Sequence, residues 1–178
     1  IREFGSGNIG ATNTIRVVGR IPGLIVLAID VFKGFLCVIY IAGFFMRFSP
    51  VARPELYMIL AGLAAIAGHN WTLFLKFKGG KGVAVSAGVM IGLAPGIFWI
   101  GFMVWLIIFL MSGYISVASI IASVSVPVLA LVSNQPTELT VFFSILCLAI
   151  VYKHRSNLRR LKNKEEKKIS LFKKPKTR

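Results

Sequence analysis

Charged residues are scarce over most of this chain: of its 178 residues 27 are charged, and only 13 of those lie before position 153. Hydrophobic residues make up 56% of the sequence. Residues 1–152 therefore hold too few charges to solvate the surface of a soluble domain. This composition excludes a soluble globular protein, a disordered chain and a secreted disulfide scaffold. The sequence therefore predicts an all-α integral membrane protein.

Cysteine is nearly absent too. Cys37 and Cys147 lie far apart inside apolar runs, which is typical of packing residues rather than of a redox site. The chain also lacks an HExxH motif, a Ser–His–Asp order and a carboxylate cluster, so we expect no metal, no cofactor and no covalent nucleophile. The net charge is +15, and the basic residues flank the apolar segments. The chain has no zinc module or stacked-aromatic module for binding nucleic acid. This pattern indicates contact with anionic lipid rather than nucleic acid.

Five apolar runs predict membrane helices: about Ile21–Met46, Leu56–Leu75, Val83–Met111, Ile115–Val132 and Leu139–Tyr152. The basic segments 1–20, 76–81 and 153–178 should all face the cytoplasm, which an odd number of crossings cannot satisfy. The third run contains Ala94-Pro95-Gly96, and proline followed by glycine breaks a helix. Splitting it there gives two helices of about 12 and 15 residues and a bundle of about six helices.

Small residues and charge define the remaining organisation. Gly88, Gly92 and Gly96 are spaced four apart and predict close packing between helices.

We expect a single membrane domain over residues 1–162, followed by a basic cytoplasmic tail over 163–178 that is disordered or lies on the membrane surface.

The first of three polar segments runs from Gly5 to Asn13 and is followed by Arg16 and Arg20. Glycine lets backbone amides approach an anion, and a helix starting near Thr12 would add its dipole. The side chains that could add donors are Ser6, Asn8, Thr12 and Asn13. The same composition is also common in ordinary turns.

The second polar segment begins at Gly68-His69-Asn70-Trp71 and continues to Gly82. It is not a Walker A loop, because the glycine spacing fails and Gly82 stands where Ser or Thr is needed. Lys76, Lys78 and Lys81 surround a flexible Gly79-Gly80 hinge just before a helix start. An anion site and a simple positive-inside loop both fit this pattern.

The third polar segment covers Lys153 to Leu161. At helical spacing His154, Asn157 and Leu161 share one face, while Arg155 and Arg159 share a neighbouring one. A basic helix end whose side chains reach the interface is the alternative. Separately, Asp30 and Lys33 lie inside the first span, where charges are costly, so they should pair with each other or with a ligand.

Together the three segments resemble the signature motifs of the bacterial acyl-phosphate-dependent glycerol-3-phosphate acyltransferases. The matching residues are Gly5–Asn13, Arg16 and Asp30-x-x-Lys33-Gly34; then Gly68-His69, Phe74 and Phe77–Ala84; then His154-Arg155, Asn157, Arg160-Leu161 and Glu166. The chain departs from the family at Thr72, Lys153, Ser156 and Lys164, and it resembles the family without its first helix, so that seven helices become six.

The resemblance implies transfer of a fatty acyl group from acyl phosphate to the sn-1 hydroxyl of glycerol 3-phosphate, on the cytoplasmic face of the bacterial inner membrane. It implies catalytic roles for His154, Asn157 and Lys81. It implies substrate binding by Ser6, Gly7, Asn8, Gly10, Thr12, Asn13, Arg16, Lys33, His69, Lys78, Gly79, Gly80, Lys81 and Arg155. The hydroxyl proton could pass to His154 or to a phosphate oxygen.

Two other functions would explain part of this pattern. An anion transporter or channel would place charged residues at the midplane of several helices, whereas here Asp30 and Lys33 are the only two within the spans. A scaffold that binds anionic lipid would explain the basic tail but not the first polar segment.

Overall fold

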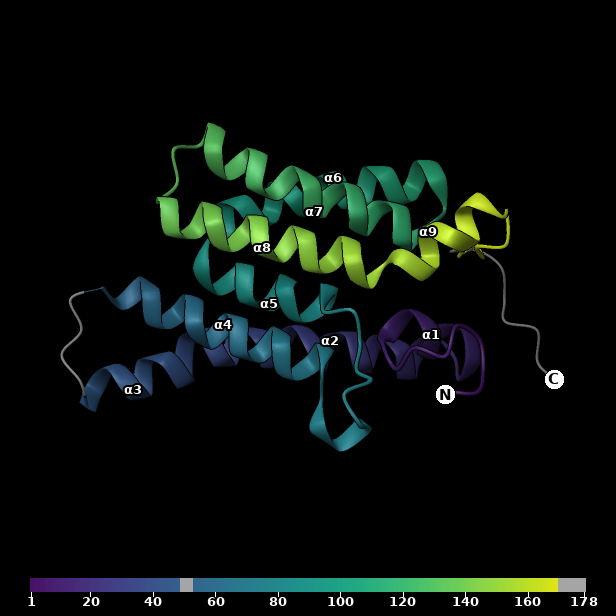
Figure 1. Cartoon of the computed structure of the whole chain (residues 1–178), viewed down its shortest axis with the longest axis horizontal. Coiled ribbons are helices and arrows are strands. Elements are labelled where there is room, and N and C mark those ends of the chain that lie inside the picture. Colours follow the sequence, from purple (N-terminus) through teal and green to yellow (C-terminus); the bar gives the residue numbers. More distant parts are fainter. Residues whose placement is uncertain (49–52, 170–178) are drawn as a thin grey trace. The chain divides into compact units, whose positions relative to one another are not determined.

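The structure, a computed structural model, describes residues 1–48 and 53–169. Within these ranges the chain is helical and has no strand (Figure 1). The elements are α1 (Ala11–Val17), α2 (Arg20–Leu36), the π-helix η1 (Cys37–Ile41), α3 (Ala42–Phe48), α4 (Pro54–Asn70), the 3₁₀-helix η2 (Leu73–Leu75), α5 (Val83–Leu93), α6 (Pro95–Ser112), α7 (Ile115–Val132), α8 (Thr137–Lys153) and α9 (Arg155–Lys162). The chain forms two compact units, Ile1–Ala94 and a second that begins at Pro95.

In the first unit, α2, η1 and α3 form one continuous span of 29 residues, Arg20–Phe48. Its proline, Pro22, lies in the first turn, where the missing N–H breaks no helical hydrogen bond. The span packs on α4 and α5, and α1 packs on the start of α2. This arrangement brings the N-terminal segment beside the membrane helix that carries Asp30 and Lys33.

Glycines set the close contact between α2 and α5. A β-carbon at Gly34 would overlap the carbonyl oxygen of Val85, and one at Gly88 would overlap that of Val31. Gly92 lies against Val38 on the same side of α5. The predicted packing role is therefore confirmed for Gly88 and Gly92. Gly96 has no neighbour within 4 Å, because it follows the helix break and belongs to α6.

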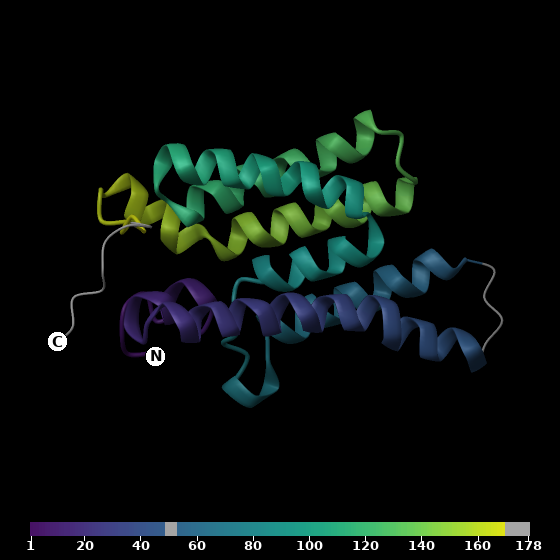
Figure 2. The same ribbon diagram turned by 180° about the vertical axis from the view of Figure 1, so that it is seen from behind.

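In the second unit, α7 packs antiparallel to α6, and α8 packs antiparallel to α7 (Figures 1 and 2). The indole N–H of Trp105 donates to Ser119 Oγ at 3.2 Å and links α6 to α7. Phe142 and Phe143 of α8 are fully buried. After α9 the chain turns back, and the N–H of Ile169 donates to the carbonyl of Gly113 at 3.0 Å. The turn between α6 and α7 and the segment after α9 thus lie at the same end of this unit.

The helices agree with the predicted apolar runs, including the break at Ala94. Among the described residues, four helices qualify as membrane spans by length and composition: Arg20–Phe48, Pro54–Leu75, Pro95–Ser112 and Ile115–Val132. The bent pair α8 and α9 makes a fifth if it is counted as one span, and α5 is a shorter apolar helix. The helix after the break has 18 residues, longer than the predicted 15, because it starts at Pro95 itself, which suits a first helical position, and continues to Ser112.

The predicted domain boundaries stay a prediction. We predicted one domain over residues 1–162 and a tail over 163–178. The described residues up to Ala94 and those from Pro95 onward cluster into separate units, and residues 163–169 pack within the second. The rest of the predicted tail, residues 170–178, lies outside the described residues.

Candidate functional site

The first polar segment forms a tight loop before α1. Gly5 and Gly7 have positive φ angles of 65° and 69°, which favour glycine. Asn13 organises the loop: its Oδ1 accepts from the N–H of Ser6 at 2.8 Å, and its Nδ2 donates to the carbonyls of Ile1 and Phe4, both at 3.1 Å. Both amide hydrogens of Asn13 are therefore used in holding the loop, and anion binding by Asn13 stays a prediction.

The rest of this segment also supports the loop. Asn8 Oδ1 accepts from the N–H of Gly10 at 2.9 Å, and Gly10 caps α1. Thr12 and Arg16 lie on α1 and are partly exposed, while Ser6 and Gly7 are exposed. Sequence reasoning missed Arg2, whose guanidinium donates to the carbonyl of Lys78 at 2.7 Å. That hydrogen bond ties the first polar segment to the second.

The second polar segment folds back over the C-terminal end of α4. The N–H of Gly79 donates to the carbonyl of Asn70 at 3.3 Å, and that of Gly80 donates to the carbonyl of His69 at 3.1 Å. A β-carbon at Gly79 would overlap the His69 carbonyl, and one at Gly80 would overlap the His69 ring. The two glycines, predicted as a flexible hinge, are closely packed because the loop satisfies the last carbonyls of α4.

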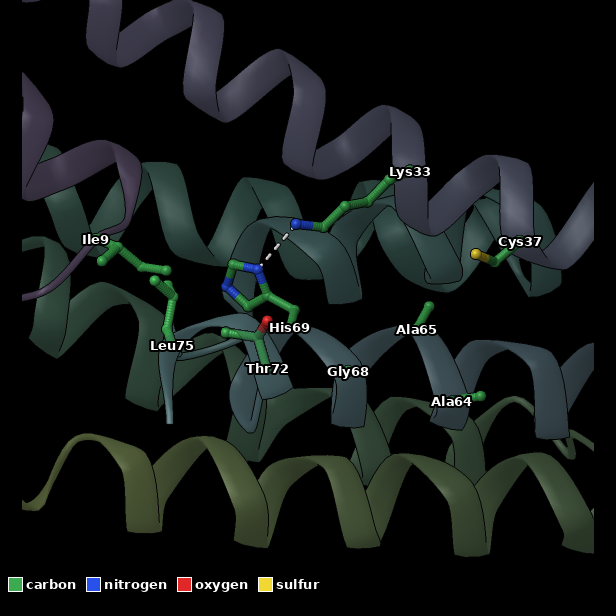
Figure 3. Close-up of a pocket in the computed structure, with 9 residues that line it drawn as sticks. All are labelled: Ile9, Lys33, Cys37, Ala64, Ala65, Gly68, His69, Thr72 and Leu75. Carbon is green, nitrogen blue, oxygen red and sulfur yellow. Dashed lines mark hydrogen bonds between the residues drawn. The ribbon is translucent and has the colours of Figure 1, made fainter. Parts of the chain in front are cut away.

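Asp30, Lys33 and His69 form a polar cluster between α2 and α4. Lys33 Nζ donates to Asp30 Oδ1 at 2.5 Å. The same Nζ lies 2.9 Å from His69 Nδ1 (Figure 3). An ammonium group has no acceptor, so His69 Nδ1 must accept and the ring proton of the neutral imidazole lies on Nε2. The Asp30 and His69 side chains are buried, whereas that of Lys33 is 41% exposed. The cationic end of the cluster therefore faces accessible space.

A pocket of about 390 Å³ lies beside this cluster (Figure 3). Its lining residues come from the first polar segment, α2, η1, α4 and the second polar segment: Ile9, Lys33, Cys37, Ala64, Ala65, Gly68, His69, Thr72 and Leu75. Lys33, His69 and Thr72 supply polar groups, and the others are apolar or small. Lys78 and Lys81 belong to the adjoining loop but do not line this pocket. The arrangement can hold an anionic head beside an apolar chain.

Several pocket residues escaped the sequence analysis. Cys37 lies one helical turn beyond Lys33, and Ala65 lies one turn before His69. Their spacing from the candidates Lys33 and His69 was the available signal, but small residues at helical spacing are common in any packed membrane helix. Only the packing of η1 on α4 identifies them as pocket-lining.

The third polar segment lies at the junction of α8 and α9 in the second unit. His154 is 3% exposed, and its Nδ1 lies 2.8 Å from the carbonyl oxygen of Ile150. A carbonyl only accepts, so His154 Nδ1 carries a proton and the basic nitrogen of the neutral ring is Nε2. Asn157 is also buried, while Arg155 and Arg159 are exposed, in agreement with the predicted faces. The Arg155 guanidinium lies 4.3 Å from the centre of the Tyr152 ring.

Glu166 connects this segment to the start of α7. Its Oε1 accepts from Asn157 Nδ2 at 2.7 Å and from Ser116 Oγ at 3.2 Å, and its Oε2 accepts from Arg160 Nε at 2.7 Å. Burial alone would raise the pKa of Glu166, but these three hydrogen bonds and the Arg160 charge outweigh it, so the pKa lies below its ordinary value. The carboxylate therefore stays ionised and holds Asn157 in place.

A family model described as glycerol-3-phosphate acyltransferase matches residues 1–164 of the chain. The chain is 41% identical to glycerol-3-phosphate acyltransferase 2 of Moorella thermoacetica, over 95% of this chain and 83% of that protein. It is 39% identical to the glycerol-3-phosphate acyltransferase of Endomicrobium trichonymphae, over 98% and 84% respectively.

Two crystal structures of the integral membrane glycerol 3-phosphate acyltransferase PlsY are also similar to this chain. The glycerol 3-phosphate form matches with a TM-score of 0.84 at 35% identity, over 97% of this chain and 85% of that one. The lysophosphatidic acid form matches with a TM-score of 0.81, over 93% and 82% respectively. These likenesses extend over nearly the whole chain and include its three polar segments.

Proposed function

The chain belongs to the glycerol-3-phosphate acyltransferase family, a family of membrane acyltransferases, and we propose that it acylates the sn-1 hydroxyl of glycerol 3-phosphate with acyl phosphate as the donor. The products are 1-acyl-glycerol 3-phosphate, a lysophosphatidic acid, and inorganic phosphate. This reaction is the first acylation of phospholipid synthesis.

The pocket of the first unit is the observation that carries this proposal. Acyl phosphate combines a multiply charged head with a long apolar chain, and the pocket combines Lys33 and His69 with small apolar residues on η1 and α4. The lysine is held by Asp30 rather than free to rotate, so its ammonium is oriented before substrate binds. Each charge-assisted hydrogen bond to a phosphate contributes about 1.5–3 kcal/mol.

The reaction needs no cofactor, because acyl phosphate is already activated. The sn-1 oxygen forms a bond to the acyl carbon, the bond from that carbon to the phosphate oxygen breaks, and phosphate leaves with the electron pair. We propose that the hydroxyl proton passes to a phosphate oxygen of the substrate rather than to the protein. The basic residues stabilise the negative charge that develops on the leaving group.

The remaining predicted roles are part of the same proposal. His154 and Asn157 orient the acceptor, Arg16 and Lys81 hold its phosphate, and the first polar segment supplies backbone amides to the phosphates. The anion contacts proposed for Lys78 and Arg155 complete the set, while Gly79 and Gly80, whose amides donate to carbonyls of α4, shape the loop that carries Lys78 and Lys81. The apolar spans and the bacterial relatives support a place in the bacterial cytoplasmic membrane with the site on the cytoplasmic side.

Phosphate release from palmitoyl phosphate by the purified chain tests the function. We expect release only when glycerol 3-phosphate is present, with lysophosphatidic acid formed in equal amount. Lys81→Ala should lower turnover at least tenfold, since it removes a cation from the charged site, whereas Lys76→Ala in the same loop should not. Equal activity with palmitoyl coenzyme A would contradict the proposed donor, and absence of acceptor-dependent release would contradict the reaction.

A further inference from the structure

Helix α9 presents a basic face of which the proposed chemistry uses only Arg155. When α9 is projected at about 100° per residue, Arg155, Leu158, Arg159 and Lys162 fall within an arc of about 100°. All four side chains are exposed. The buried Asn157 lies on the opposite side of the helix. The basic face is therefore a true surface of this unit rather than part of its core.

Helix α9 bends away from α8 beside an exposed tyrosine. The axes of α8 and α9 differ by 50°, with the bend at His154. Tyr152 in the last turn of α8 is 58% exposed, and the Arg155 guanidinium lies over its ring. Tyrosines are enriched at the interface between hydrocarbon and headgroups, and the aromatic ring attracts the cation that lies over it.

Charge complementarity identifies the partner. The segment 153–169 contains eight basic and two acidic residues. Glu166 is buried and bound to Arg160, which leaves Glu165 as the exposed acid of this segment. The basic face also includes Leu158, which is 42% exposed. A short helix that combines basic side chains with an exposed leucine suits a negatively charged lipid surface, where the leucine enters the headgroup boundary.

We propose that the basic face of α9, formed by Arg155, Leu158, Arg159 and Lys162, docks onto the headgroups of anionic lipids in the membrane that α8 crosses. The arginines and the lysine donate to lipid phosphates, and Leu158 lies among the uppermost acyl carbons. Each basic side chain near such a surface strengthens binding about fivefold. The contact is electrostatic, so it weakens as the salt concentration rises.

The depth of a fluorophore on α9 tests this inference without reference to activity. The full chain, with Cys37→Ala and Cys147→Ala, carries a bimane label at Leu158→Cys and is reconstituted in nanodiscs that contain a headgroup-level nitroxide quencher. We expect at least threefold stronger quenching when a third of the phosphatidylcholine is replaced by phosphatidylglycerol, with the increase lost at high salt. A label at Ser156→Cys, outside the basic face, should respond less.

Two charge-matched variants separate the basic face from general charge. Arg159→Gln combined with Lys162→Gln should remove the response to phosphatidylglycerol, and Arg47→Gln combined with Arg53→Gln in the first unit should retain it. Equal quenching in both lipids, or a full response in the α9 variant, would overturn the proposal. The proposal would also be overturned if glycerol 3-phosphate, added to pure phosphatidylcholine discs, changed the quenching as much as phosphatidylglycerol does. The basic face would then bind free phosphate instead of lipid.

Discussion

The two histidines of the chain are held in opposite tautomers. Lys33 donates to Nδ1 of His69, so that nitrogen is engaged as an acceptor, whereas the carbonyl of Ile150 accepts from Nδ1 of His154. The neutral ring of His69 therefore carries its proton on Nε2, and that of His154 carries its proton on Nδ1, so the basic nitrogen of His154 is Nε2.

Replacing this histidine separates the two routes for the hydroxyl proton. We expect His154→Gln to raise the KM for glycerol 3-phosphate at least fivefold while some turnover persists at saturating substrate, because in the proposed mechanism the proton goes to a phosphate oxygen and His154 orients the acceptor. Steady-state kinetics with varied acceptor concentration measure both constants. Complete loss of turnover with an unchanged KM would identify His154 as an obligatory base.

The buried carboxylate of Asp30 orients Lys33 toward His69 and the pocket. Asp30→Asn keeps the shape but removes the charge that holds the ammonium, so we expect about tenfold lower turnover with the melting temperature nearly unchanged. Turnover and thermal melting of the purified variant check this. Glu55→Gln, on the exposed first turn of α4, is the control and should behave as the unchanged protein. Full activity in Asp30→Asn would refute the orienting role.

At the scale of elements, the contact between α2 and α5 depends on backbone-to-backbone approach. The oxygen that a β-carbon at Gly88 would meet belongs to the backbone of α2, so no rotamer change can make room. We expect Gly88→Ala to destabilise the protein by about 1–3 kcal/mol. Gly96→Ala, where the added carbon meets open space, should be neutral or slightly stabilising. Melting curves of the two variants in the same detergent check the difference; equal stability would rule out the close contact.

The carboxylate of Glu166 joins α7, α9 and the segment that follows. Its pKa in the folded protein lies below its ordinary value of about 4.3. The stabilisation is therefore complete above that ordinary value and is lost as pH falls through the lower, folded-state pKa. Glu166→Gln should cost about 1–3 kcal/mol at pH 7, because it leaves Arg160 without its charged partner.

The pH dependence distinguishes this carboxylate from a merely space-filling residue. Melting temperatures of the unchanged protein and of Glu166→Gln should differ most at neutral pH and converge as pH falls below 4.3. Glu165→Gln, an exposed neighbour, should follow the unchanged protein throughout. A constant difference between Glu166→Gln and the parent at every pH would argue against an ionised Glu166.

At the scale of the whole molecule, the second unit restricts the membrane topology. The turn at Gly113 and the segment after α9 share one end, and the turn at Asn134 follows α7 at the other. With the basic C-terminal segment in the cytoplasm, positions 96 and 135 should face outward. Cysteines placed singly at Gly96 and Gln135 should react with an impermeant maleimide added outside intact cells. Protection of both positions would contradict this orientation.

The helical spans, the break before Pro95 and the three polar segments were predictable from the sequence. A bilayer offers the backbone no hydrogen-bond partner, so a long apolar run must be a helix, and proline interrupts it for local steric reasons. The family resemblance rests on motifs of neighbouring residues, so it too could be recognised from the sequence alone. These properties depend on neighbours in the chain and need no knowledge of the packing.

The contacts between distant segments were decided only by the tertiary structure. Arg2 binds the Lys78 carbonyl, Cys37 and Ala65 line the pocket, and Asn13 is used inside its own loop. Gly79 and Gly80 were read as a hinge, but the end of α4 packs them tightly. No local pattern encodes such contacts, because the same residue types at the same spacing form a turn, a packed face or a binding pocket according to which helix lies opposite them.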